Sequence, residues 1–132
     1  MADIFKDLTP DESLANDGVW FYFKNKYGFK LKSISKENKV WNKSVNAFMK
    51  TNRIESLDKI PEWLRKDFIK IFISCVVVDW KGVEFDGKPA KFTGDNVLMV
   101  FEKLPQVFHA CMEFASEIDN YKELQDEEDL KN

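Results

Sequence analysis

An apolar run over residues 71–78 is the feature that most limits how this chain can fold. It is followed by a mostly polar segment, 83–92, in which Asp86-Gly87 is a strong turn dipeptide. Pro89, close behind, cannot donate a backbone hydrogen bond. We therefore predict a buried segment that leads into a short ordered loop, with three apolar side chains of the loop pointing inward: Val83, Phe85 and Phe92.

The apolar run suits either a helix or a buried strand. Pro61 fits the first turn of a helix, and an apolar pattern with helical spacing continues from Glu62 to about Trp80. The β-branched residues at 76–78 would equally suit a strand. Because the pattern is continuous, we favour one helix over residues 61–80, and a buried strand within 71–78 is the alternative.

The composition is that of a folded single domain. The chain has 132 residues, 44% of them hydrophobic, and its 12 Phe and 4 Trp supply ample core. The longest apolar run is far shorter than the roughly 20 residues that span a bilayer, and the first residues lack an export signal. We therefore expect a cytoplasmic protein without membrane contact. Cys75 and Cys111 lie in apolar stretches and are expected to be buried thiols; a bridge between them is the less favoured alternative.

Residues 18–34 predict a β-hairpin. The first arm is Val-Trp-Phe-Tyr-Phe, and the second alternates apolar residues with lysines, which is the period of a half-buried strand. Gly28 is expected to supply the positive φ of the turn. Two strands alone are marginal, so the hairpin must pack on helices or pair with another chain.

The rest of the chain predicts amphipathic helices over 36–52, 94–104 and 105–121. Ser35 and Thr93 are candidate N-caps, and Pro105 suits a helical first turn. Residues 1–16 are expected to be an irregular lead-in and 122–132 a mobile acidic tail. The predicted fold is α+β, predominantly α-helical, in one compact domain over 17–121.

Charge is distributed unevenly along the chain. The net charge is −3, yet seven lysines and one acid lie between Lys24 and Lys43, with acidic segments on both sides. This basic stretch could steer an acidic partner or could be a solvated face. The hairpin lysines lie beside Trp20, Tyr22 and Phe29, as in surfaces that stack on single strands. Nucleic acid is nevertheless not expected, because the pI is near 5.3, arginine is scarce and the aromatic residues are needed in the core.

Reactive motifs are not found in the sequence. The single histidine, His109, has Glu113 one turn on, but a metal site needs further ligands, so we expect a solvent-edge pair. His109 and Cys111 point to different faces of a helix, which counts against a thiol nucleophile. No glycine-rich phosphate loop is present. The sequence therefore predicts no enzyme, no cofactor and no metal.

A pattern of turn and cap residues resembles the C-terminal half of the tail assembly chaperones of long-tailed bacteriophages. It covers roughly residues 68–121: a helix ends in a tryptophan, a turn of the Asp-Gly-x-Pro type follows, and a capped helix is then broken at Pro105. The residues that carry it, to which we assign a loop-shaping role, are Trp80, Gly82, Asp86, Gly87, Pro89, Phe92 and Thr93.

The resemblance implies a small non-enzymatic protein of the host cell cytoplasm that is absent from the mature virion. Such proteins bind the tape-measure protein and help recruit tail-tube subunits, and the apolar faces also allow self-association. If a partner is gripped by helix faces, the candidate contacts are Trp41, Phe48, Phe108, Met112 and Ala115, although amphipathic stripes usually face the core. The alternatives are a structural tail or connector component of the virion, or a small nucleic-acid-binding regulatory protein.

Overall fold

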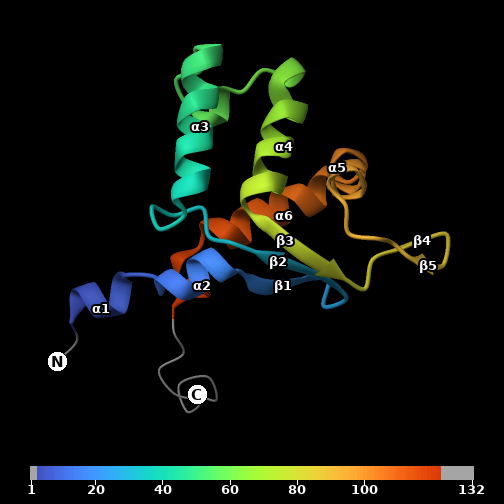
Figure 1. Cartoon of the computed structure of the whole chain (residues 1–132), viewed down its shortest axis with the longest axis horizontal. Helices are drawn as coiled ribbons and strands as arrows, with labels where there is room; N and C mark the ends of the chain where they lie inside the picture. The colour runs from blue at the N-terminus through green and yellow to red at the C-terminus, as the bar shows by residue number, and fades with distance from the viewer. Residues whose placement is uncertain (1–2, 123–132) are drawn as a thin grey trace.

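A three-stranded antiparallel sheet lies at the centre of an α+β fold (Figure 1). The structure is a computed structural model that describes residues 3–122. The sheet has the order β1 (Val19–Phe23), β2 (Tyr27–Leu31), β3 (Val77–Lys81). The predicted α+β class and the N-terminal hairpin are confirmed, and the hairpin finds its third strand within the same chain.

The predicted helix over 61–80 is wrong at both ends. A 3₁₀ turn, η2 (Glu62–Leu64), precedes α4 (Arg65–Cys75), and the chain then turns into β3. Trp80 pairs with Phe29 and Val77 with Leu31, so the β-branched end of the apolar run serves as a sheet strand. Helical periodicity could not reveal this change, because a strand and a helix that are both buried look alike over so few residues.

The turn of the hairpin also differs from the prediction. The positive φ values fall at Lys24 (55°) and Asn25 (56°), and Gly28 is an ordinary member of β2. Gly28 serves close packing instead: a Cβ there would lie 2.9 Å from Cγ of Lys81 and 3.0 Å from Cε1 of Tyr22. The glycine therefore makes room for two side chains that cross its strand.

The lead-in predicted to be irregular contains two short helices, α1 (Ile4–Leu8) and α2 (Glu12–Asp17). Aspartates cap both of them, and Ala15 in α2 is fully buried. The backbone of α2 is tied to the domain by hydrogen bonds from Asp11 N to Tyr121 O (2.7 Å) and from Ser33 N to Ala15 O (2.9 Å). The domain therefore begins before residue 17, and the predicted tail lies outside the described residues except for Lys122.

The remaining helices follow the predicted order with shifted ends. They are α3 (Lys39–Asn52), α5 (Gly94–Lys103) and α6 (Pro105–Ser116), with 3₁₀ turns η1 (Leu57–Lys59) and η3 (Ile118–Tyr121). Thr93 caps α5 as predicted, whereas α3 starts three residues late because Asn38, not Ser35, accepts the capping hydrogen bond from Trp41 N (3.1 Å). In Figure 1, α3 and α4 stand side by side above the sheet, and α6 runs behind it.

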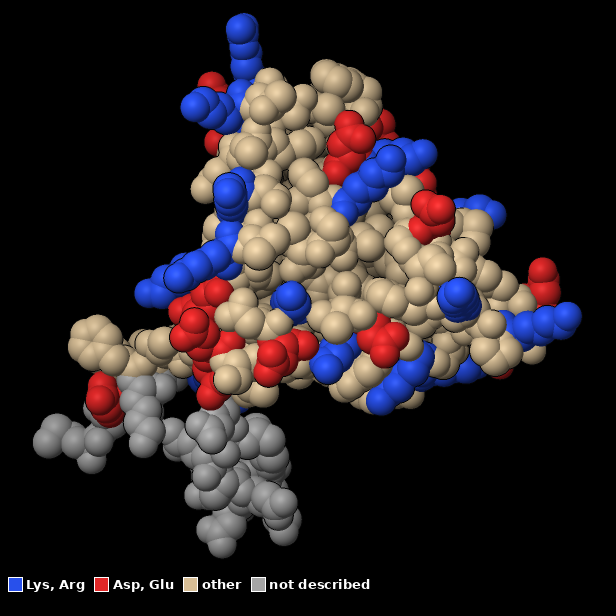
Figure 2. All heavy atoms as spheres, in the orientation of Figure 1, with Lys and Arg blue, Asp and Glu red and all other residues tan. Residues whose placement is uncertain are grey.

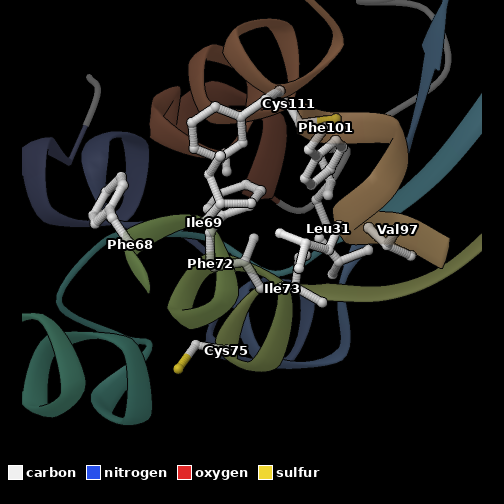
Figure 3. Packing of buried hydrophobic residues seen from close by; sticks show 14 of the residues in the cluster. Leu31, Phe68, Ile69, Phe72, Ile73, Cys75, Val97, Phe101 and Cys111 are labelled. Atoms are coloured by element: carbon white, nitrogen blue, oxygen red, sulfur yellow. The ribbon is translucent and has the colours of Figure 1, made fainter. Parts of the chain in front are cut away.

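The core lies between α4, α5, α6 and the inner face of the sheet. Figure 3 shows apolar side chains of α4 meeting those of α5 and α6, with Leu31 contributed by β2. Phe72 is fully buried, and its ring centroid lies 5.3 Å from that of Phe108 and 6.1 Å from that of Phe101. Such aromatic pairs add about 0.5–1.5 kcal/mol each beyond area burial, so the rings bind the helices firmly to one another.

Candidate partner-binding surfaces

The five side chains proposed as helix-face contacts lie in or against the core. Trp41, Phe48, Phe108 and Ala115 are buried, and Met112 is half-buried against the same cluster. The structure brings three of them together: the rings of Trp41, Phe48 and Phe108 all lie within 6.3 Å of the ring of Phe68. In this conformation the side chains of Trp41, Phe48 and Phe108 hold helices of the domain together. The sequence analysis had named this core role as the alternative to partner contact.

The Trp80 loop, residues 80–93, connects β3 to α5 and is held by contacts around the indole of Trp80. The indole Nε1 of Trp80 donates a hydrogen bond to Ala90 O (3.0 Å), which closes the loop across its base. The rings of Phe85 and Phe92 meet the indole edge to face, at 6.2 and 5.8 Å. Val83, Phe85 and Phe92 are all partly buried against the core, as predicted.

The turn residues of this loop adopt the backbone that the sequence suggested. A small hairpin of β4 (Glu84–Phe85) and β5 (Lys88–Pro89) turns at Asp86 (φ 52°) and Gly87 (φ 80°). Gly82 has φ 78°, and a Cβ there would lie 2.9 Å from Lys26 O, so the loop also sits close to the first hairpin. Thr93 Oγ1 then accepts from Asn96 N (3.1 Å) and starts α5.

The two thiols lie on opposite sides of the core. Figure 3 places Cys111 on one side of the cluster and Cys75 on the other, and both are free. Burial raises the pKa of the Cys111 thiol well above its usual value, so the thiol stays protonated at neutral pH and is a poor nucleophile. Within residues 3–122, no three His, Cys, Asp or Glu side chains converge to hold a metal ion.

His109 pairs with a residue of another helix. Nη2 of Arg65 donates to Nε2 of His109 (3.2 Å), across a groove of about 460 Å³ between the start of α4 and the corner where α5 meets α6. We call this the α4–α6 groove. Its lining residues are Glu62, Arg65, Lys66, Ile69, Glu102, Pro105 and His109. Two of these residues, Ile69 and Pro105, are apolar, and the others supply side chains of both charges and an imidazole.

Exposed apolar side chains occur next in sequence to groove-lining residues and at the N-terminus. Trp63 is 76% exposed and Leu104 is 44% exposed, and they adjoin the lining residues Glu62 and Pro105 in sequence. The second group lies on α1, which Figure 1 shows projecting from the body of the molecule; its exposed side chains are Ile4, Phe5 and Leu8. Sequence periodicity assigned Trp63 and Leu104 to the apolar faces of the predicted helices 61–80 and 94–104, whereas both side chains are exposed; the α1 group was not found because residues 1–16 were expected to be irregular.

The outer face of the sheet carries aromatic and basic side chains. Since strand residues alternate between faces, Phe21 and Phe29 point to the core while Trp20 and Tyr22 point outward. We call this outer surface the open sheet face; its residues are Trp20, Tyr22, Lys30, Asp79 and Lys81. The sequence analysis placed Trp20 and Tyr22 in the core, and the alternation of the first arm was the signal that could have separated them from Phe21.

Charged side chains are separated on the surface. Figure 2 shows basic side chains along the edge on which α3 lies and acidic ones gathered near α1 and α2. The hairpin lysines Lys24 and Lys26 are exposed, at the tip of the β1–β2 turn. The basic middle and the acidic N-terminal segment predicted from the sequence therefore occupy different regions of the fold.

The fold and these surfaces define a small α+β domain that presents an apolar arm, a charged groove and an aromatic sheet face. Residues 31–132, which are 102 of the 132 residues, match the model of the YdaY prophage protein family. The chain belongs to this family and is a phage-related protein. No curated protein and no solved structure matches the chain. None of the helices within residues 3–122 is both long and apolar enough to span a bilayer.

Proposed function

We propose that this protein is a tail assembly chaperone of a long-tailed phage, which binds the tape-measure protein and helps recruit tail-tube subunits. One observation carries the proposal. The region matched to the prophage family, 31–132, contains the whole segment 68–121 whose turn and cap residues resemble those chaperones. Family membership supports the phage origin, and the resemblance supplies the particular role.

The α4–α6 groove supports this role physically. An amphipathic partner helix docks by placing apolar side chains in a groove and polar ones against its rims. Ile69 and Pro105 supply apolar lining, and Trp63, which follows the lining residue Glu62 in the chain, is an exposed aromatic side chain of the kind that dominates binding energies. The groove is lined by basic residues such as Arg65 and by acidic residues such as Glu102, so it can pair with either acidic or basic side chains of a partner helix.

The N-terminal arm supports a transient interaction with apolar segments. Phe5 is 79% exposed on α1, and its neighbours Ile4 and Leu8 are also exposed. Side chains of this kind cost little to desolvate and can cover the apolar stripe of a long helix before that helix finds its final partners. Holding such helices soluble is a binding task, so the proposed function requires no catalytic group.

Mass spectrometry tests this role against that of a structural virion component. In an infected cell, the protein should co-precipitate with the tape-measure protein from the cytoplasmic lysate and be missing from purified particles. Stoichiometric presence in mature particles would reject the chaperone and favour a tail or connector subunit.

A further inference from the structure

The open sheet face combines stacked aromatic rings with ammonium groups. The rings of Trp20 and Tyr22 stack at a centroid distance of 6.3 Å and an interplanar angle of 24°. Nζ of Lys81, which comes from β3, lies 4.1 Å from the centroid of Trp20 and 5.1 Å from that of Tyr22. Two strands that are not neighbours in the sheet, β1 and β3, thus supply these side chains, and only the fold brings Lys81 across β2 to the two rings.

Several cations on and beside this face lack acidic partners. Lys30 lies between Trp20 and Asp79 in the strand register. Lys24 and Lys26 lie at the hairpin tip, at the end of this face, where Nζ of Lys24 is 5.9 Å from the ring centroid of Phe23 and Nζ of Lys26 is 5.3 Å from that of Tyr27. Phe23 and Tyr27 belong to the core-facing side of the hairpin, so these two flexible side chains must swing outward to meet a ligand on the open sheet face. The ion pairs found among the described side chains involve other residues, namely Glu55, Lys59, Asp119 and Lys122. Four lysines are therefore available to a polyanion, and Asp79 is the single acid in the defined face.

We propose that the open sheet face binds single-stranded nucleic acid, with bases stacking on Trp20 and Tyr22 and phosphates meeting Lys24, Lys26, Lys30 and Lys81. A basic surface that carries aromatic rings is the usual solution for single strands, because every base has a ring face to stack. The ammonium of Lys81 rests over the indole as a weakly held cation, so an incoming base displaces it toward a phosphate.

The basic residues of the proposed site are all lysines, and this predicts binding with little sequence specificity. Lysine is a point charge without the fork that reads guanine edges, so the contacts engage the backbone and carry little sequence information. This site is separate from the α4–α6 groove, and it goes beyond the proposed chaperone function. The sequence analysis gave three arguments against nucleic acid: the acidic pI, the scarcity of arginine and the need for these aromatic residues in the core. The structure removes the third argument, because Trp20 and Tyr22 point away from the core.

Fluorescence anisotropy with a labelled oligothymidylate and a labelled oligouridylate tests the proposal. Four phosphate contacts predict a log–log salt slope near −3, so affinity should fall about 50-fold between 50 and 200 mM salt. Tyr22→Ala should weaken binding about tenfold, since each stacked base contributes in that range. Ultraviolet crosslinking should attach the oligonucleotide to peptides from the hairpin or β3.

A matched pair of variants separates the site from the overall charge. Lys24→Glu/Lys26→Glu should abolish most binding, whereas Lys43→Glu/Lys50→Glu on α3 changes the net charge equally and should change affinity less than about threefold if binding is local. Circular dichroism confirms folding of each variant. Equal losses from both pairs, or no binding by the wild type at low salt, would overturn the proposal. Equal competition by polyglutamate with no effect of Tyr22→Ala would also overturn it, in favour of an acidic polypeptide.

Discussion

The side-chain amide of Asn38 donates a hydrogen bond to the backbone carbonyl of Cys75 (Nδ2···O, 3.1 Å), 37 residues further along the chain. The same amide donates to Ser33 O (2.9 Å), and its carbonyl oxygen accepts from Trp41 N. Cys75 is the last residue of α4, so the buried Asn38 side chain ties the start of α3 to the point where α4 gives way to β3.

Replacing Asn38 should therefore destabilise the whole domain. In Asn38→Ala the carbonyls of Ser33 and Cys75 and the N–H of Trp41 lose their hydrogen-bond partner. We expect the free energy of unfolding to fall by about 3 kcal/mol. Urea titration followed by circular dichroism measures it. Asn46→Ala, an exposed position of the same helix, is the control and should change stability by less than about 0.5 kcal/mol. Equal effects at the two positions would contradict the role of Asn38.

Alanine should change the free energy of unfolding in opposite directions at two glycines, Gly87 in the Trp80 loop and Gly94 at the start of α5. Gly87 has φ 80°, so Gly87→Ala should cost about 1–2 kcal/mol even though a Cβ there has free space. Gly94 opens α5 with equal space and without a positive φ, so Gly94→Ala should stabilise by up to about 1 kcal/mol. Thermal unfolding of both variants checks the pair, and a loss at Gly94 with no loss at Gly87 would refute the turn assignment.

Stability should fall in alkaline solution because of two buried groups. Burial raises the pKa of Cys111 and of Tyr121, with a smaller contribution from Cys111 in the case of Tyr121. Both groups stay protonated in the folded and unfolded states at neutral pH. The unfolded chain loses the Cys111 proton above about pH 9 and the Tyr121 proton above about pH 10, whereas the folded chain keeps both, so the free energy of unfolding should drop by about 1.4 kcal/mol per pH unit for each group once its unfolded-state pKa is passed.

The variants Cys111→Ala and Tyr121→Phe isolate these contributions. Each should be less stable than the wild type at pH 7, Tyr121→Phe because Tyr121 Oη donates to Leu31 O (3.0 Å). Each should also lose stability less steeply between about pH 9 and 11, because the removed group no longer titrates in the unfolded chain. Urea titrations across this range provide the slopes, and unchanged slopes in both variants would contradict the assignment.

The α4–α6 groove predicts a partner-binding variant that folds normally. Trp63→Ser removes an exposed aromatic anchor and should weaken binding to the tape-measure protein at least about tenfold without loss of stability. Val40→Ser, exposed on α3 and far in sequence from the groove-lining residues, is the matched control and should bind like the wild type. Calorimetric titration measures both affinities. Equal affinities of Trp63→Ser and Val40→Ser would exclude Trp63 from the partner-binding surface.

Local chemistry was predictable from the sequence, whereas pairing across the fold was not. The turn at Asp86-Gly87 and the cap at Thr93 depend on a few neighbouring residues, and both appear as predicted. The end of α4 depends on β2, which pairs with β3, and on Asn38, so periodicity alone extended that helix too far. Strand alternation separates Trp20 from Phe21, but which of the two faces outward depended on which face of the hairpin packed against the helices.

Co-expression with the tape-measure protein of the same phage tests the central claim most directly. The fraction of tape-measure protein in the soluble lysate, and its co-purification with this chain, are the quantities to measure. We predict that the partner is insoluble alone and becomes soluble and co-purifies with the wild-type chain, and that Trp63→Ser reduces both effects. Aggregation of the tape-measure protein regardless of this chain would contradict the account.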